Sequence, residues 1–150
     1  MKTLARHLTA NFFNCKNSKL QDINAILSAL RDVSEHLRFT LVDSITHQLS
    51  EDHYAIMMLF HEGHLTLHVY TSLKYVALDV FLCQENACPD DVAHSEFFKP
   101  DKIRSTLLKR GDFGTAKDIR PKTKTHLAPL RKLHNTGAKV IHVLAKRSHK

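Results

Sequence analysis

The residues best suited to chemistry lie at alternate positions of two neighbouring segments, 64–70 and 75–83. Alternate side chains of an extended strand point to the same face of a sheet. One face of both segments is wholly aliphatic, whereas the other carries groups that can exchange protons. Cysteine and phenylalanine are poor choices for a water-exposed face, so we expect a ligand pocket or a subunit interface there. The residues of this face are His64, Thr66, His68, Tyr70, Tyr75, Ala77, Asp79, Phe81 and Cys83.

Two histidines four residues apart, His64 and His68, raise the question of a metal site. In a helix this spacing places two ligands on one face, but along a strand it separates them by about 13 Å. We therefore predict no metal at this pair. No other histidine and cysteine spacing in the chain matches a paired CxxC zinc pattern.

The stretch Glu62-Gly63-His64-Leu65-Thr66-Leu67-His68, followed by Asp79-Val80-Phe81-Leu82-Cys83, resembles the core of the small prokaryotic S-adenosylmethionine decarboxylases. The likeness begins at Arg6-His7-Leu8 and spans most of the first hundred residues. It implies an α+β fold, a two-layer sandwich in which a mostly antiparallel sheet carries helices on one face. It further implies a four-layer dimer made by pairing sheets, and decarboxylation of S-adenosylmethionine for spermidine biosynthesis.

Members of this family cut their own chain between a Glu and a Ser, and the serine becomes a pyruvoyl cofactor. The resemblance assigns Glu62 and Gly63 to the cleavage site, His68 to processing, and Cys83 to proton donation during decarboxylation. The polar residues of the same face are then expected to bind the ligand: His64, Thr66, Tyr70 and Asp79.

This chain departs from the family where the chemistry takes place. Gly63 replaces the serine, Tyr70-Thr71-Ser72 replaces a Trp-Pro-Glu or Tyr-Pro-Glu, and Ala55 replaces a serine that assists processing. Glycine has no oxygen to attack the preceding carbonyl and no β-carbon from which the resulting ester could be eliminated. Ser72, nine residues on, is not placed by its position in the sequence to act instead. We therefore expect no pyruvoyl cofactor.

Three interpretations follow for the function. The first is a non-decarboxylating or regulatory homologue that binds S-adenosylmethionine or a related nucleoside, as a homodimer or as a heterodimer with an active homologue. The second is a cofactor-free lyase that forms methylthioadenosine and homoserine lactone by intramolecular displacement, a step that proximity alone can accelerate. The third is a processing-blocked variant of a true decarboxylase, with an engineered Gly63.

The elements that must position these residues can be read from hydrophobic periodicity. Strands are expected at 4–12, 40–48, 54–60, 64–71, 75–83 and 102–109, and a further strand-like run at 139–144. Short connections favour antiparallel neighbours. A helix is expected at 19–37, with a capping box that begins at Ser18, and a short helix is expected between Pro89 and Phe98. We divide the chain into a decarboxylase-like domain, 1–114, and a basic C-terminal extension, 115–150.

Composition and charge restrict the class of protein. The chain has 150 residues, of which 43% are hydrophobic and 25% charged, as in an ordinary globular domain. No apolar run could span a bilayer, so we expect no membrane partner and a cytoplasmic location. The odd set Cys15, Cys83 and Cys88 favours free thiols. The net charge of +7 permits nucleic-acid binding, but the basic runs lack interleaved aromatic residues and therefore favour a solvated surface.

Overall fold

A computed structural model describes residues 4–84, 88–93, 97–111 and 121–127. Its strands are β1 (Ala5–Phe13), β2 (Leu41–Ser50), β3 (His53–Phe60), β4 (Gly63–Tyr70), β5 (Tyr75–Leu82), β6 (Lys102–Arg110) and β7 (Thr123–Leu127). Its helices are the 3-10 turn η1 (Ser18–Gln21), α1 (Ile23–His36) and α2 (Asp90–Ala93). None of these described helices is long and apolar enough to cross a membrane.

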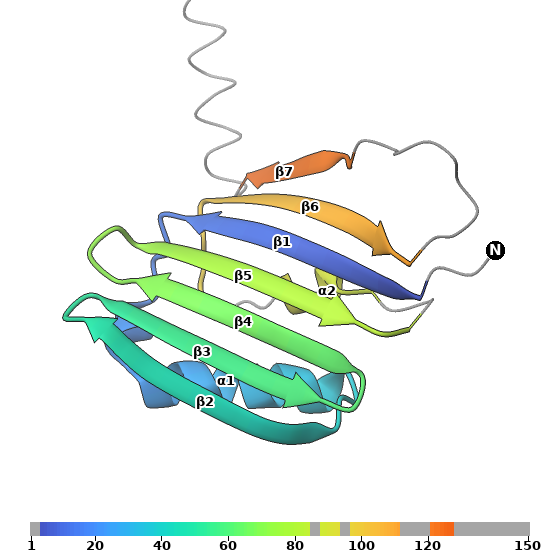
Figure 1. Cartoon of the computed structure of the whole chain (residues 1–150). Helices are drawn as coiled ribbons and strands as arrows, with labels where there is room; N and C mark the ends of the chain where they lie inside the picture. Colours follow the sequence, from blue (N-terminus) through green and yellow to red (C-terminus); the bar gives the residue numbers. More distant parts are fainter. Residues whose placement is uncertain (1–3, 85–87, 94–96, 112–120, 128–150) are drawn as a thin grey trace, which may run out of the picture.

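The strands form one seven-stranded sheet in the order β2-β3-β4-β5-β1-β6-β7 (Figure 1). Every neighbouring pair is antiparallel. The strands β2, β3, β4 and β5 follow one another along the chain and are joined by tight turns. The first strand, β1, lies between β5 and β6 in the sheet. The α+β fold with helices on one face is therefore confirmed.

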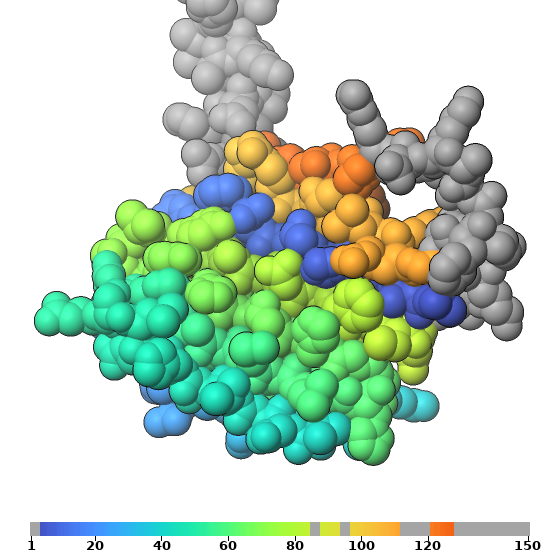
Figure 2. All heavy atoms as spheres, in the orientation of Figure 1, coloured from blue at the N-terminus to red at the C-terminus, as the bar shows by residue number. Residues whose placement is uncertain are grey.

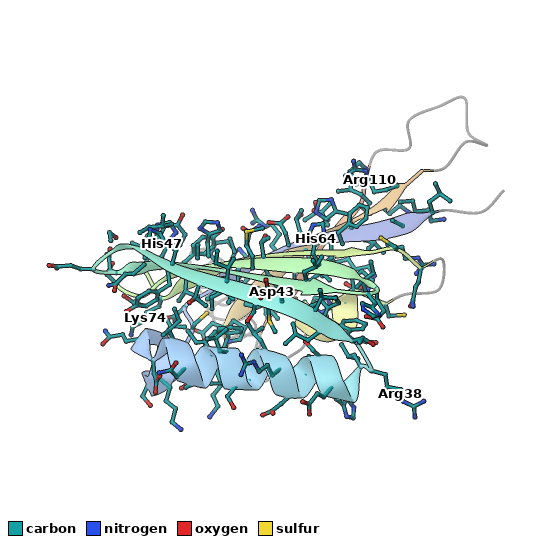
Figure 3. All side chains as sticks on the ribbon, turned by 60° about the horizontal axis from the view of Figure 1, so that its bottom comes forward. Arg38, Asp43, His47, His64, Lys74 and Arg110 are labelled. Carbon is teal, nitrogen blue, oxygen red and sulfur yellow. The ribbon has the colours of Figure 1, made fainter. Side chains whose placement is uncertain are left out.

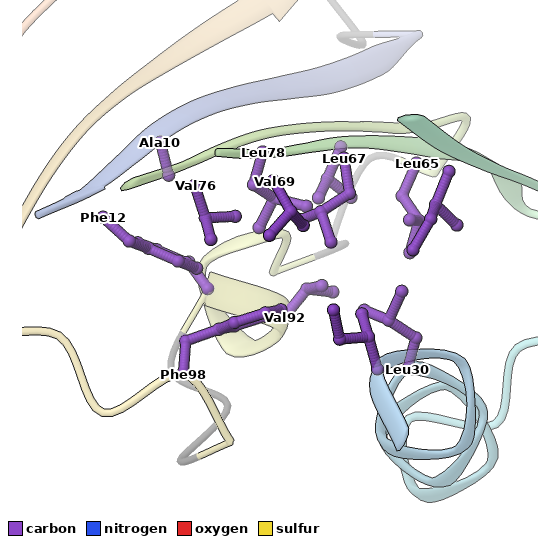
Figure 4. Packing of buried hydrophobic residues seen from close by; sticks show 14 of the residues in the cluster. Ala10, Phe12, Leu30, Leu65, Leu67, Val69, Val76, Leu78, Val92 and Phe98 are labelled. Carbon is purple, nitrogen blue, oxygen red and sulfur yellow. The ribbon is translucent and has the colours of Figure 1, made fainter. Parts of the chain in front are cut away.

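The hydrophobic core lies between one face of the sheet and the two α-helices. Figure 4 shows Leu30 of α1 and Val92 of α2 pointing toward the aliphatic side chains of β4 and β5. Phe98 packs against Phe12 of β1 with ring centroids 5.7 Å apart. The strand residues of this core are almost fully buried, and they include Leu65, Leu67, Val69, Val76, Leu78 and Val80. Burial of such side chains, at about 25 cal/mol per Å² of apolar surface, holds the helices on this face.

The helix begins later than its sequence pattern predicts. Ser18–Gln21 forms η1, and the N-cap of α1 is Asp22, whose carboxylate accepts hydrogen bonds from the backbone N–H groups of Asn24 and Ala25. Asn17 caps η1 in the same way, through the N–H of Lys19. The predicted capping box at Ser18 is therefore wrong, because two polar residues nearby offer better-placed side-chain acceptors to separate short turns.

Two other expectations concern the C-terminal part. The strand β7 was not anticipated, because Thr123-Lys124-Thr125-His126-Leu127 shows no apolar alternation; it pairs with β6 at the edge of the sheet. It belongs to the segment that we assigned to the basic extension. The run 139–144 lies outside the described residues, and the helix after Pro89 is described only as Asp90–Ala93.

Candidate functional site

The polar face predicted from the alternation is the face of the sheet opposite the helices. Figure 2 shows it from the front, where the strands rather than helices form the surface. In Figure 3, His47, His64 and Arg110 lie on the side of the sheet away from α1. Half-buried and fully buried residues alternate along β5, and the half-buried ones belong to this side, which we call the open face.

The first group of predicted site residues lies where β4 begins. Gly63 pairs with Leu82, and the N–H of Cys83 donates a hydrogen bond of 2.7 Å to the carbonyl oxygen of Glu62. The Glu62 carboxylate accepts hydrogen bonds from the backbone N–H of Thr40 at 2.8 Å and from its hydroxyl at 3.2 Å. The bond from the Thr40 N–H is the main cause that lowers the pKa of Glu62. Glu62 thus holds the β3–β4 turn against the chain that enters β2.

Gly63 adopts a backbone conformation that suits glycine alone. Its φ is +151°, and a β-carbon built on it would lie 1.9 Å from the carbonyl oxygen of Phe81 and 3.0 Å from the Cα of Leu82. Both contacts are with the backbone of the neighbouring strand, which cannot rotate away as a side chain can. Any larger residue here requires a shift of β4 or β5.

A second group surrounds the ring of Phe81 in the open face, opposite His64. The His64 ring stacks on Phe81 at 5.4 Å, the His7 ring meets it edge-on at 5.8 Å, and the Arg110 guanidinium lies 5.9 Å from its centre. The Arg110 guanidinium donates a hydrogen bond to His7 Nδ1 at 3.3 Å, so Nδ1 is the acceptor nitrogen of this ring. The other nitrogen, Nε2, then carries the proton and donates a hydrogen bond to the Asp79 carboxylate at 3.3 Å. The Asp79 side chain is 45% exposed, and Thr66 lies directly opposite it on β4.

A third group lies toward the other end of β4. His68 Nδ1 and His53 Nε2 are 2.8 Å apart and share a hydrogen bond. The Tyr70 ring stacks on His53, with centroids 4.0 Å apart. We call His53 and His68 the imidazole pair. His68 lies opposite Ala77, which is six residues before Cys83, so His68 and Cys83 are about 20 Å apart along the strands.

Beside this pair, Asp52 connects two turns. Its carboxylate accepts hydrogen bonds from the hydroxyl groups of Ser72 and Ser50, and these bonds lower the pKa of Asp52. Ser72 follows the end of β4, whereas Gly63 begins it, so roughly 23 Å of strand separates them. Ser72 is too remote to attack the carbonyl of Glu62, as the sequence analysis anticipated.

The structure thus divides the predicted site residues among three places. Glu62, Gly63 and Cys83 lie together, His64, Thr66 and Asp79 lie beside Phe81, and His68 and Tyr70 lie toward the far end. Sequence reasoning did not select His7, His53 and Arg110 as site residues. The sequence did offer a way to find His53. It lies two residues before Ala55, which the resemblance matches to a processing residue, and alternate residues of β3 share one face.

Among the described residues, none of the three cysteines forms a disulfide bond. Cys15 is buried beneath the sheet, and burial, with a smaller effect of Asp101, raises its pKa to about 12. Cys83 and Cys88 are exposed. In the described part of the chain, no group of three or more histidine, cysteine, aspartate or glutamate side chains is arranged to hold a metal ion.

Comparisons with known proteins agree with this architecture. Residues 6–111 match the family model described as S-adenosylmethionine decarboxylase. A solved structure with the same fold is the adenosylmethionine decarboxylase from Aquifex aeolicus, with a TM-score of 0.65 and 18% identity. The match covers 79% of this chain and all of the other.

The sequences of known relatives establish the family. The S-adenosylmethionine decarboxylase proenzyme of Methanococcus maripaludis strain C5 is 33% identical over 113 residues, covering 74% of this chain and 93% of the relative. That of Acidithiobacillus ferrooxidans is 26% identical over 113 residues, covering 74% of this chain and 85% of the relative. The chain belongs to the S-adenosylmethionine decarboxylase family.

Proposed function

We propose that this protein binds S-adenosylmethionine or a related nucleoside without decarboxylating it, and that it forms no pyruvoyl group. The observation that carries the proposal is the conformation of Gly63. Family members make their cofactor from a serine that corresponds to this position, and the backbone here brings the carbonyl of Phe81 to 1.9 Å from where its β-carbon would lie. The geometry at residue 63 therefore suits a glycine and not a cofactor-forming serine.

Ligand binding is supported by the groups that remain on the open face. Asp79 presents a partly exposed carboxylate, which suits the positive sulfonium or ammonium group of S-adenosylmethionine. His64 and Thr66 lie on the neighbouring strand beside Phe81 and Asp79. The hydrogen bond from His7 fixes the orientation of the Asp79 carboxylate, so this acceptor is held in place before a ligand arrives.

The proposal includes self-association through the open face, with a second copy or an active homologue as the partner. Ile45 and Met57 lie directly opposite each other on β2 and β3 and are 65% and 52% exposed. Leu59, two residues from Met57 on the same face, is 50% exposed. A contiguous apolar patch of this kind on a sheet without covering helices suits a protein contact.

The test is to incubate the purified full chain with S-adenosylmethionine and to follow the intact protein mass and the small-molecule products by mass spectrometry. We expect an uncleaved chain and unchanged substrate. Decarboxylated product would overturn the proposal, and methylthioadenosine with homoserine lactone would identify the lyase activity instead.

Binding is measured separately by calorimetry. We expect saturable binding of S-adenosylmethionine that is weakened at least about tenfold in Asp79→Asn, which corresponds to about 1.4 kcal/mol. Arg31→Gln on the exposed side of α1 is the matched control and is expected to bind as the wild type does. Equal affinities of the wild type and Asp79→Asn would contradict the role given to Asp79.

A further inference from the structure

The imidazole pair has a geometry close to that of two ligands on one metal ion. His53 Nε2 and His68 Nδ1 are 2.8 Å apart. In a tetrahedral site with metal–nitrogen bonds of about 2.0 to 2.1 Å, two ligating nitrogens lie about 3.3 Å apart. The two nitrogens therefore need to separate by only about half an ångström, which small rotations of the side chains provide.

The hydrogen bond between the two rings also has the geometry of a metal site. Two imidazole nitrogens can share a hydrogen bond only when one is a donor and the other a neutral acceptor with its lone pair directed at the first. A metal ion bound between the rings takes lone pairs from both nitrogens, so the shared proton moves to the other nitrogen of its own ring, Nδ1 of His53 or Nε2 of His68, and both rings stay neutral. Neutral imidazole is a preferred ligand of zinc, copper and nickel ions.

The surroundings of the pair hold the rings in place and leave room above them. Tyr70 stacks on His53 with an interplanar angle of 17°, and both histidines project from paired, regular strands. Ala55 lies directly opposite His68 and two residues from His53 on the same face, so the neighbour that both histidines share is a small methyl group. Both histidines are half-buried, which leaves access for the water molecules that would complete the coordination.

We propose that His53 and His68 form a two-histidine site for a divalent transition metal ion of the zinc, nickel and copper class. Water molecules fill the other coordination positions. The site differs from the pair His64 and His68, for which the sequence predicts no metal because both lie on one strand. In the imidazole pair the two ligands come from neighbouring strands. The inference rests on the geometry of the imidazole pair and does not depend on the proposed function.

The test is a calorimetric titration of the full chain with Ni²⁺ at neutral pH, after dialysis against a chelator. Ni²⁺ favours imidazole, and the titration compares the wild type with His53→Gln, His68→Gln and the control His64→Gln. His64 lies on the same face but stacks on Phe81, so its replacement leaves the imidazole pair intact. Histidines elsewhere in the chain contribute equally to all four titrations.

We expect the wild type and His64→Gln to bind one more equivalent of Ni²⁺ than His53→Gln and His68→Gln, and we expect the last two to lose the same equivalent. Identical titrations of the wild type and His53→Gln would overturn the proposal, as would loss of the equivalent in His64→Gln. Thermal midpoints in the presence of chelator check that each variant folds.

A second measurement on the wild type does not depend on the variants. In a titration with Zn²⁺, the imidazole ¹⁵N resonances of His53 and His68 are expected to shift together at the first equivalent. Shifts confined to other histidines at that point would overturn the proposal.

Discussion

At the scale of single residues, the structure shows how Glu62 and Gly63 build the turn between β3 and β4. Gly63 places the β3–β4 turn so close to β5 that the carbonyl of Phe81 occupies the space of a β-carbon. Glu62, the preceding residue, uses its carboxylate to hold Thr40 and its carbonyl to accept a hydrogen bond from Cys83. Glu62 and Gly63 therefore close the end of the hairpin.

A first prediction concerns Gly63 itself. Gly63→Ala is expected to lower the free energy of unfolding by about 2 to 6 kcal/mol, because strain at this φ and overpacking against the β5 backbone each cost about 1 to 3 kcal/mol. Urea denaturation followed by circular dichroism measures the change.

Gly111→Ala is the matched control: φ is +70° there, and the added β-carbon meets only the exposed side chain of Leu4. Its expected cost is about 1 kcal/mol. Equal costs at the two positions would show that the tight contact at Gly63 is not real.

A second prediction concerns the pH dependence of Glu62. The hydrogen bonds from Thr40 lower the folded-state pKa of Glu62 below its value in the unfolded chain. The stabilisation is therefore complete above the ordinary glutamate pKa and is lost as the pH falls through the lowered one. Glu62→Gln should reduce stability at pH 7, and the difference from the wild type should shrink in acid.

Urea midpoints of the two proteins between pH 7 and the acid limit of folding test this sign. Glu35→Gln, on an exposed turn of α1, provides the control with the same change of charge. A difference between wild type and Glu62→Gln that grew as the pH fell would contradict the assignment of the Thr40 bonds.

At the scale of elements, periodicity located the strands well. Strands β1 to β6 lie within two residues of the positions expected from the sequence. The apolar alternation of β4 and β5 matches a face that is buried along the whole strand, whereas β2 has no buried residue. The strand β7 carries no apolar alternation, since it is exposed along most of its length and is held by backbone pairing with β6. The sequence could not reveal it, because its stabilising interactions come from the partner strand.

The site residues, too, were placed correctly where the pattern lies within one strand, and not where it depends on the pairing of two strands. Alternation correctly placed His64, Thr66, Tyr75 and Asp79 on one face, where Thr66, Tyr75 and Asp79 are half-buried and His64 is exposed. Resemblance grouped His68 with Cys83, yet the hairpin register sets them about 20 Å apart within one chain. The imidazole pair depends on the β3–β4 pairing, so hydrophobic periodicity within either strand alone could not identify it.

A third prediction tests the start of α1. Asp22→Ala should cost about 1 kcal/mol, within a range of about 0.5 to 2, because it removes the acceptor for the N–H groups of Asn24 and Ala25. Ser18→Ala should cost less, since no described helix uses Ser18 as its N-cap. Chemical denaturation of both variants decides between the structure and the sequence pattern. A larger loss of stability in Ser18→Ala than in Asp22→Ala would support the capping box at Ser18 instead.

At the scale of the whole molecule, the sheet has two unlike faces. One is covered by α1, α2 and the segment around Phe98, and its strand residues are almost completely buried. The other presents half-buried polar and aromatic residues in its middle and an exposed apolar patch over β2 and β3. The candidate ligand groups and the apolar patch thus share a face, so a partner that covers the patch would also enclose the ligand groups and reduce their contact with water.

The last prediction follows from this arrangement. If the open face is the surface of self-association, Ile45→Glu should weaken the dimer at least about tenfold, because a charge would be desolvated inside an apolar contact. Leu73→Glu is the matched control, since Leu73 is 70% exposed but lies in the β4–β5 turn, off the open face. Sedimentation velocity over a range of concentrations measures both variants and the wild type. A monomeric wild type, or equal weakening by the two substitutions, would exclude the open face as the interface. Weakening by Ile45→Glu alone, together with a parallel loss of S-adenosylmethionine affinity, would show that the partner helps to form the binding site.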